Sequence, residues 1–261
     1  MISRPNNLTM DEVTRKLNTD IIGRNLYHFK TIDSTNLYAK KLVKDDAQEG
    51  VVVVADVQSS GRGRKNRTWS SPEGGLWFSV ILYPNIPPQR GMLITMASSV
   101  AVAQGIKEIT GVNLMIKWPN DLLINGLKVC GILTELEAEM DKINYIVVGI
   151  GINVNNQLEK ELQKTATTLK LETGNQVSRV ELLRSILKSF DENYNRLISG
   201  DYSFIRDLWL SHTNIIGKKV QVEDEKTVIT GVVSDVDDSG CLILDTKENQ
   251  VRIVSGDIKY L

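Results

Sequence analysis

The sequence is poor in the residues from which many functional sites are built. It has only 2 cysteines, Cys130 and Cys241, and 2 histidines among 261 residues, which excludes a zinc site made of cysteine and histidine. The cysteines lie far apart, and we expect both to be buried and reduced. There is no apolar core of a signal peptide near the N-terminus, and no apolar run approaches the ~20 residues of a membrane span. These absences predict a soluble protein of the cytoplasm.

The sequence also has no excess of charge of either sign. The 31 Lys and Arg residues nearly balance the 32 Asp and Glu residues, so nothing global favours binding to a polyanion, and any basic site must be local. Neither a Walker A motif nor a Rossmann glycine fingerprint occurs. Apolar residues make up 41% and charged residues 24%, as in ordinary globular proteins.

Hydrophobic periodicity predicts an α+β fold. One helix is expected to begin at Ser34. A second is expected over residues 92–109, ended by Gly111, and a third from Ser178 to about residue 197. Strand-like runs occupy residues 26–32, 51–55, 76–83, 114–118, 122–124, 128–137 and 143–153. Because the last four follow one another as hairpins, we predict a mixed, largely antiparallel sheet with packed helices.

Three segments are expected along the chain. Residues 1–25 form a helical extension, in which Thr9 and Glu12 make a capping box. Residues 26–212 form the main domain. From residue 213 to 261 short alternating strands, expected over 219–222, 228–233, 241–244 and 250–254, are separated by Asp-, Ser- and Gly-rich turns, which predicts a small β-barrel. A core of that size is marginal alone, so we expect the barrel to lean on the main domain.

The stretch from Gln58 to Trp69 is the most informative. It carries four cations in six positions, Arg62, Arg64, Lys65 and Arg67, around Gly61 and Gly63. Glycines allow backbone N–H groups to approach a phosphate, arginine binds phosphate oxygens in a fork, and Trp69 offers a surface for a base. A solvated basic loop or a nucleic-acid contact remain alternatives. Because its charges lack obvious internal partners, we expect the loop to be mobile until an anion binds.

A second pattern surrounds the Asn125-Gly126 turn. A two-residue hairpin there pairs Leu123 with Lys128 and Asp121 with Cys130. Asp121 and Lys128 then lie on one face as diagonal neighbours, roughly 7–8 Å apart. A lysine on an otherwise apolar strand is unusual. It either serves a function, or snorkels at the hairpin end or pairs structurally with Asp121.

Two further clusters are weaker individually. Glycines in the strand Val147–Asn153 indicate close approach of a ligand or tight packing of a helix, with Asn153 at the strand end. Asp33, Ser34, Thr35 and Asn36 stand where a strand gives way to a helix, and capping explains one of them. The surplus hydroxyls and amides are suited to a small polar ligand.

Together, and in this order, these segments resemble the biotin–protein ligase family over residues 26–261. The matching segments are Asp33-Ser34-Thr35-Asn36, Gln58 with Gly61-Arg62-Gly63-Arg64 through Trp69, Lys117-Trp118-Pro119-Asn120-Asp121, Lys128-x-x-Gly131-Ile132-Leu133 and Gly149-Ile150-Gly151-Ile152-Asn153. One such motif is weak, but five in register are specific. The resemblance implies a class II synthetase-like ligase core that joins biotin to AMP and then to a lysine of a biotin carboxyl carrier domain of a carboxylase.

The resemblance also implies the site residues. Biotin-binding positions would be Ser34, Thr35, Asn36, Gln58, Arg62, Gly63, Arg64, Lys128 and Gly131. ATP-binding positions would be Arg64, Arg67, Trp69, Lys128 and Asn153. Catalytic roles are expected for Lys128, Arg64 and Asp121, with Mg²⁺ carried by ATP and no metal held by the protein alone. A homodimer is expected because dimers are common in the family.

Some family members also carry an N-terminal helix–turn–helix domain and repress transcription. About 25 residues precede the matching pattern here, too few for that module, so we expect no specific DNA binding. Two alternatives remain open. One is a lipoate–protein ligase, whose apolar acid would not need these polar groups. The other is a non-catalytic nucleotide- or nucleic-acid-binding module built on the loop of residues 58–68, hereafter the arginine loop.

Overall fold

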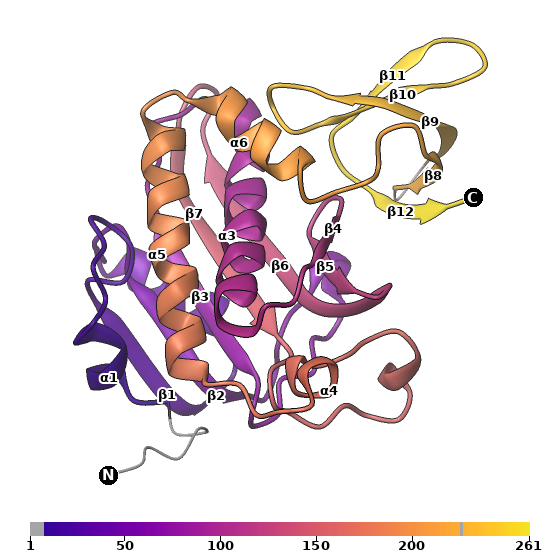
Figure 1. The fold of residues 1–261 in the computed structure, drawn as a ribbon. Helices are drawn as coiled ribbons and strands as arrows, with labels where there is room; N and C mark the ends of the chain where they lie inside the picture. Colours follow the sequence, from indigo (N-terminus) through magenta and orange to yellow (C-terminus); the bar gives the residue numbers. More distant parts are fainter. Residues whose placement is uncertain (1–7, 225–226) are drawn as a thin grey trace.

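A seven-stranded sheet forms the centre of the computed structural model, which describes residues 8–224 and 227–261 (Figure 1). The strands lie in the order β1-β2-β3-β7-β6-β5-β4. Only β1 and β2 are paired in parallel, and the other neighbours are antiparallel. This confirms the mixed, largely antiparallel sheet. The strands are β1 (Leu26–Ile32), β2 (Val52–Gln58), β3 (Leu76–Leu82), β4 (Met115–Lys117), β5 (Asp121–Ile124), β6 (Leu127–Ala138) and β7 (Ile143–Ile152).

The middle strands are apolar because both of their faces are covered. On one face, Val52, Val54 and Phe78 belong to the main core with the helices α3 (Met92–Thr110) and α5 (Arg179–Ile198). On the other face, Val53 packs in a smaller cluster with Ala39 of α2 (Thr35–Lys44). The alternation of side chains along β2 and β3 therefore creates two cores. The face that carries α2 also carries the candidate site.

Helix ends partly follow the predictions. Gly111 ends α3 with a φ of 73°, and the Ser178 hydroxyl accepts from the N–H of Glu181 at the start of α5, as expected. Thr9 precedes α1 (Met10–Thr14) and Ser34 precedes α2, but neither side chain makes a capping hydrogen bond. The capping-box prediction at Thr9 and the expectation that Ser34 caps α2 are therefore wrong. The short helix α4 (Leu169–Thr173) and the helix α6 (Tyr202–Leu210) were not predicted.

A second, all-antiparallel sheet follows α6 and lies beside it (Figure 1). Its order is β11-β10-β9-β8-β12, so β11 and β12 are the outer strands of what we expected to be a barrel. Its strands are β8 (Lys219–Glu223), β9 (Val228–Val236), β10 (Leu242–Asp245), β11 (Gln250–Ile253) and β12 (Asp257–Tyr260). The sequence analysis missed β12.

The second sheet packs on the main body, as its small size led us to expect. The indole of Trp118 donates to the carbonyl of Gly240 at 3.2 Å, and Arg206 of α6 pairs with Asp235 at 2.7 Å. Cys130 and Cys241 are both buried and free, which confirms the prediction for the cysteines. Among the helices that the structure describes, none has the length and apolar character that a membrane crossing requires.

Candidate active site

A cavity of about 570 Å³ opens on the α2 face of the main sheet and extends to β12. All of the site residues predicted from the sequence line it, although they come from five separate segments of the chain. They are Ser34, Thr35, Asn36, Gln58, Arg62, Gly63, Arg64, Arg67, Trp69, Asp121, Lys128, Gly131 and Asn153. The structure therefore brings the predicted residues together.

The floor of the cavity is one face of β7. Gly149, Gly151 and Asn153 follow one another at every second position, so they share this face. A Cβ at Gly149 would lie 2.0 Å from Oδ1 of Asn36, and a Cβ at Gly151 would lie 2.4 Å from Nε1 of Trp69. The two glycines are required because Asn36 and Trp69 rest directly on the strand. Of the two readings left open, close packing therefore explains both glycines.

Above Gly149 lies a group of neutral polar side chains. Gln58 Oε1 accepts from the backbone N–H of Thr35 at 2.8 Å and from its hydroxyl at 3.1 Å, and Gln58 Nε2 donates to Ser71. Asn36 Nδ2 donates to Glu135 Oε2 at 2.8 Å. Thr35 and Asn36 are almost wholly buried, 3% and 4% exposed. Buried polar groups with fixed partners form a rigid surface for a neutral polar ligand.

Trp69 occupies the middle of the floor. A Cβ at Gly131 would also meet its ring, at 2.9 Å, so the indole spans β6 and β7. Nζ of Lys128 lies 5.0 Å from the centroid of the Trp69 ring, and Trp77 packs edge-on against it. The ring separates the neutral group from the charged residues beyond it. Its contact with Lys128 is a cation–π interaction.

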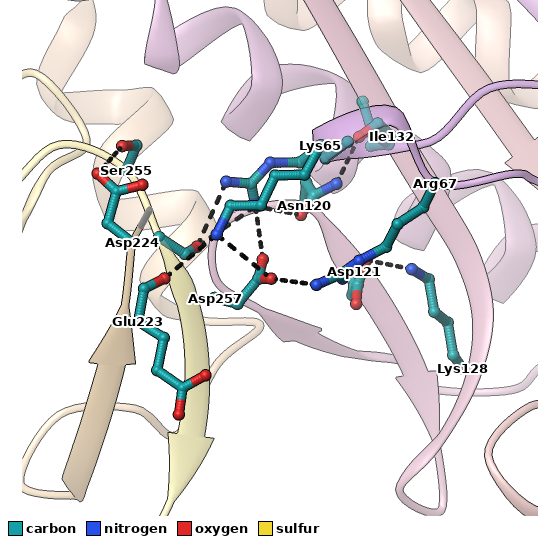
Figure 2. Close-up of polar contacts among 12 residues, drawn as sticks. Lys65, Arg67, Asn120, Asp121, Lys128, Ile132, Glu223, Asp224, Ser255 and Asp257 are labelled. Atoms are coloured by element: carbon teal, nitrogen blue, oxygen red, sulfur yellow. Dashed lines mark hydrogen bonds and ion pairs between the residues drawn. The ribbon is translucent and has the colours of Figure 1, made fainter. Parts of the chain in front are cut away.

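Lys128 and Asp121 form an ion pair with Nζ and Oδ1 2.6 Å apart (Figure 2). The predicted pairing of Leu123 with Lys128 is confirmed, but Asp121 pairs with Gly131 and not with Cys130. A bulge at Val129 is the reason, since Leu122 pairs with Cys130 and one residue of β6 is left over. The bulge places Lys128 and Gly131 on the cavity face together and brings the two charges into contact.

The arginine loop contains a turn built around the 3-10 segment Arg64–Asn66. Lys65 and Asn66 have left-handed φ values of 53° and 57°. Arg64 donates to Asn120 Oδ1 at 3.1 Å. Arg67, 67% exposed, pairs with Asp257 Oδ2 at 2.6 Å, and Nζ of Lys65 lies 3.6 Å from the same carboxylate (Figure 2).

These contacts correct one expectation. We predicted that the loop charges lack internal partners, but Asp257 of β12 is shared by Lys65, Arg67 and Arg64, the last at 3.6 Å. Partial burial works to raise the pKa of Asp257, but the hydrogen bond and charge of Arg67, with the charges of Lys65 and Arg64, outweigh it and hold the pKa below the usual 3.8. The loop is thus tied to the second sheet without an added anion.

Three functional candidates escaped the sequence analysis. Asp257 was missed because β12 was missed, although Ile258 and Tyr260 alternate with polar residues after Gly256. Asn120, which stands inside a quoted motif, was given no role. Ser79 is a fully buried polar residue in the otherwise apolar strand β3, and that contrast was the available signal.

Fold and cavity define a class of protein. A mixed sheet with a second β-sheet at one side holds a neutral polar pocket beside a group of cations, with an aromatic ring between them. Such a site suits a ligand that has a polar head and an anionic end, or two ligands that meet.

Known proteins narrow this class. Residues 28–153 match the biotin/lipoate A/B protein ligase family, and residues 215–259 match the biotin protein ligase C-terminal domain. The chain is 39% identical to the bifunctional ligase/repressor BirA of Bacillus subtilis, over 99% of this chain and 81% of that protein. It is 31% identical to a biotin–[acetyl-CoA-carboxylase] ligase of Paracoccus denitrificans, over 81% of this chain and 90% of that one.

A solved structure agrees with these matches. The biotin protein ligase of Aquifex aeolicus, in complex with biotin and ATP, superimposes with a TM-score of 0.78 at 32% identity, over 91% of this chain and 99% of that one. The chain belongs to the biotin–protein ligase family.

Proposed function

We propose that this protein activates biotin with ATP to biotinyl-5′-AMP and transfers the biotinyl group to a lysine of a biotin carboxyl carrier domain. One observation carries the proposal beyond family membership. Along the β7 face, a neutral polar pocket over Gly149, the Trp69 ring over Gly151 and the cations around Lys128 lie in one cavity. Biotin has a neutral cyclic urea at one end and a carboxylate at the other, so this order suits it.

Biotin would lie with its ureido ring against Ser34, Thr35, Asn36 and Gln58. Such a ring needs hydrogen-bond partners, because an unpaired buried polar group costs ~1–3 kcal/mol. The acid tail would then reach the positive side of the cavity, where Arg62, Gly63, Arg64, Lys128 and Gly131 are the remaining biotin candidates. ATP would take Arg64, Arg67, Trp69, Lys128 and Asn153 as partners, with its base on Trp69.

In the first step an oxygen of the biotin carboxylate attacks the α-phosphorus of ATP, and the bond to the β-phosphate oxygen breaks to release pyrophosphate. Negative charge gathers in this transition state. Arg64, Arg67 and Lys128 stabilise it; Lys128 is held in place by its ion pair with Asp121 and Arg64 by Asn120, whereas the exposed Arg67 can exchange Asp257 for the phosphates. We propose that ATP enters as its Mg²⁺ complex, since Mg²⁺ is bound by substrate phosphates and one or two oxygen side chains. Asn120 and Asp121 supply oxygens of that kind in the cavity.

In the second step the amine of the acceptor lysine attacks the carbonyl carbon of biotinyl-5′-AMP, and AMP leaves. A free lysine is mostly protonated at neutral pH, so its proton must be removed. Asp121 is the candidate to accept or orient that proton. Because the carboxylate already binds Lys128, the same residue would link both steps.

The remaining assignments are proposals of the same kind. Residues 26–212 would form the catalytic domain, 213–261 the C-terminal domain and 1–25 an extension. The outer strand β1 of the main sheet has an edge at which a second copy could pair into a homodimer, whereas the edge of β4 is bonded to the carbonyl of His212. Two free cysteines favour the reducing cytoplasm, and the balanced charge argues against specific nucleic-acid binding.

The test is direct. The protein is incubated with biotin, ATP and a carrier domain, and the biotinylated lysine is identified by mass spectrometry. We expect one modified lysine, dependent on both small molecules. In a biotin-dependent pyrophosphate-exchange assay, lipoate should compete poorly, because its apolar ring leaves the polar group unpaired. Preferential use of lipoate would establish the alternative ligase, and salt-sensitive DNA binding without exchange would support the non-catalytic alternative.

A further inference from the structure

Beneath the neutral pocket lies a hydroxyl that the proposed mechanism does not use. Ser79, in the middle of β3, is 0% exposed and pairs with Gly149 across the strands. Its Oγ lies 2.7 Å from Thr35 Oγ1 and 2.6 Å from Asn36 Oδ1. Thr35 and Asn36 line the cavity, so Ser79 contacts the pocket wall from behind.

The orientation of the Asn36 amide is determined by its surroundings. Nδ2 lies 2.8 Å from the Glu135 carboxylate and 3.3 Å from the carbonyl of Leu133, and both of these groups only accept hydrogen bonds. A flipped amide would set its oxygen against them. Oδ1 therefore faces Ser79 as an acceptor. The only hydrogen that Ser79 can donate is accordingly directed to Asn36.

The hydrogen of Thr35 then has two possible acceptors, and both lie inside the protein. One is Ser79 Oγ, 2.7 Å from Thr35 Oγ1, because Ser79 has already given its own hydrogen to Asn36. The other is Gln58 Oε1, at 3.1 Å, which also accepts the N–H of Thr35. In both cases the Thr35 oxygen offers only lone pairs to the cavity.

We propose that Ser79 is a positioning residue that makes Thr35 a pure hydrogen-bond acceptor, so that the pocket selects ligands with an N–H at that point. The inference rests on the proposed function and deepens it. The cyclic urea of biotin has two such N–H groups, whereas the dithiolane ring of lipoate has none. Glu135 contributes indirectly, because it orients Asn36 and thereby directs the hydrogen of Ser79.

The first experiment compares Ser79→Ala with the wild type in pyrophosphate exchange. Without Ser79, the Thr35 hydrogen keeps only the longer contact with Gln58 Oε1, which already accepts the N–H of Thr35, so it can turn toward an acceptor in the cavity. Asn36 Oδ1 also loses its donor. The KM for biotin should rise about tenfold, the factor that corresponds to ~1.4 kcal/mol. The turnover number and the KM for ATP should stay within about twofold, because the cations keep their own partners. Ser99→Ala, which removes an equally buried hydroxyl from α3, is the matched control.

The second experiment has a readout that a merely structural role would not change. Two cyclic carbamate analogues of biotin are used, in each of which one ring N–H is replaced by oxygen. In the wild type one of them should bind at least about tenfold more weakly than biotin, because two acceptors would face each other. In Ser79→Ala, Thr35 can supply a hydrogen, so that ratio should fall to about threefold or less. An unchanged ratio would overturn the proposal.

Glu135 provides an independent variant should Ser79→Ala fold poorly. Its side chain is partly exposed, at 23%, so replacement is tolerated more readily than in the core. Glu135→Ala should raise the KM for biotin and reduce the ratio of the affinity for biotin to that for the weaker carbamate analogue. Glu135→Gln, which keeps an acceptor, should return the KM and the affinity ratio toward their wild-type values. No rescue by glutamine would contradict the role given to Glu135. If the wild type showed no biotin-dependent exchange at all, the proposed function itself would fail, whatever the variants do.

Discussion

The two ends of the cavity are held by different kinds of interaction. At the neutral end, Thr35 and Asn36, themselves almost wholly buried, bond to Gln58, Ser79 and Glu135 of the main sheet. At the charged end, Arg67 and Lys65 belong to a loop and are held by Asp257, a residue of the other sheet. The neutral end is rigid because its hydrogen bonds are shielded from water. The charged end depends on ion pairs that are partly exposed.

This difference teaches how one cavity can serve two tasks. Recognition of a neutral ring needs donors and acceptors in fixed directions, which buried hydrogen bonds provide. Binding and release of a polyanion need charge that is available on demand, and exposed ion pairs exchange partners at low cost. The Trp69 ring, resting on Gly131 and Gly151, separates the two regions.

The largest effect is expected at the point where the two regions meet. Lys128→Ala should lower biotin-dependent pyrophosphate exchange about 10²–10³-fold, as loss of one group facing developing charge does. Stability should change by less than ~1 kcal/mol, because the ion pair with Asp121 is partly exposed. Exchange and thermal unfolding are measured together, with Lys188→Ala, on the exposed side of α5, as the control. Near-normal exchange would remove Lys128 from the mechanism.

Alanine substitutions at the two β7 glycines should affect the two ends of the cavity differently. Gly149→Ala drives a methyl group into Asn36 and should raise the KM for biotin, while Gly151→Ala displaces Trp69 and should raise the KM for ATP. Overpacking of this kind costs ~1–3 kcal/mol, so effects of about tenfold are expected. Steady-state kinetics with each substrate varied in turn provide the test. If both variants weakened both substrates equally, the division of the cavity would be wrong.

A smaller difference between the two ends of the cavity is expected in how ligand affinity depends on salt concentration. The Debye length falls from ~10 Å at 0.1 M to ~3 Å at 1 M, so ATP binding should weaken several-fold over that range. Biotinol, the neutral alcohol of biotin, engages only the shielded end and should bind with nearly constant affinity. Calorimetric titration of each ligand at both ionic strengths measures this. A common salt dependence would mean that the neutral end is less shielded than its burial implies.

The smallest effect is expected at Asp257. Its pKa is lowered in the folded state, so the stabilisation it provides is complete above the ordinary pKa of 3.8 and is lost as the pH falls through the lower folded value. Asp257→Asn should therefore cost ~0.2–1 kcal/mol at pH 7 and less at pH 3, which lies below the ordinary pKa. Urea unfolding at the two pH values measures this. Faster proteolysis of the loop 61–68 in the variant would independently show that the ion pairs between this loop and residue 257 are lost.

Local pattern was sufficient for most of the main fold. The β-branched run Val51–Ala55 and the Asn125-Gly126 turn predicted β2 and the β5–β6 hairpin, and Gly111 marked the end of α3. The bulge at Val129 was beyond reach, because the sequence pattern does not record which strand carries an extra residue. Capping at Thr9 also failed, since a suitable side chain makes its bond only if the backbone presents the N–H.

The sequence by itself marked many of the residues that line the cavity. Motifs in a fixed order marked Thr35, Gln58, Arg64 and Lys128, and each lines the cavity. Tertiary structure alone decided their partners: Asp257 for the loop cations, Asp121 in direct contact with Lys128, and Ser79 behind Thr35. The physical reason is the separation along the chain of the residues that interact. Motifs and turns are local features of the chain, whereas an ion pair or a buried hydrogen bond depends on strands that meet only when both sheets have assembled.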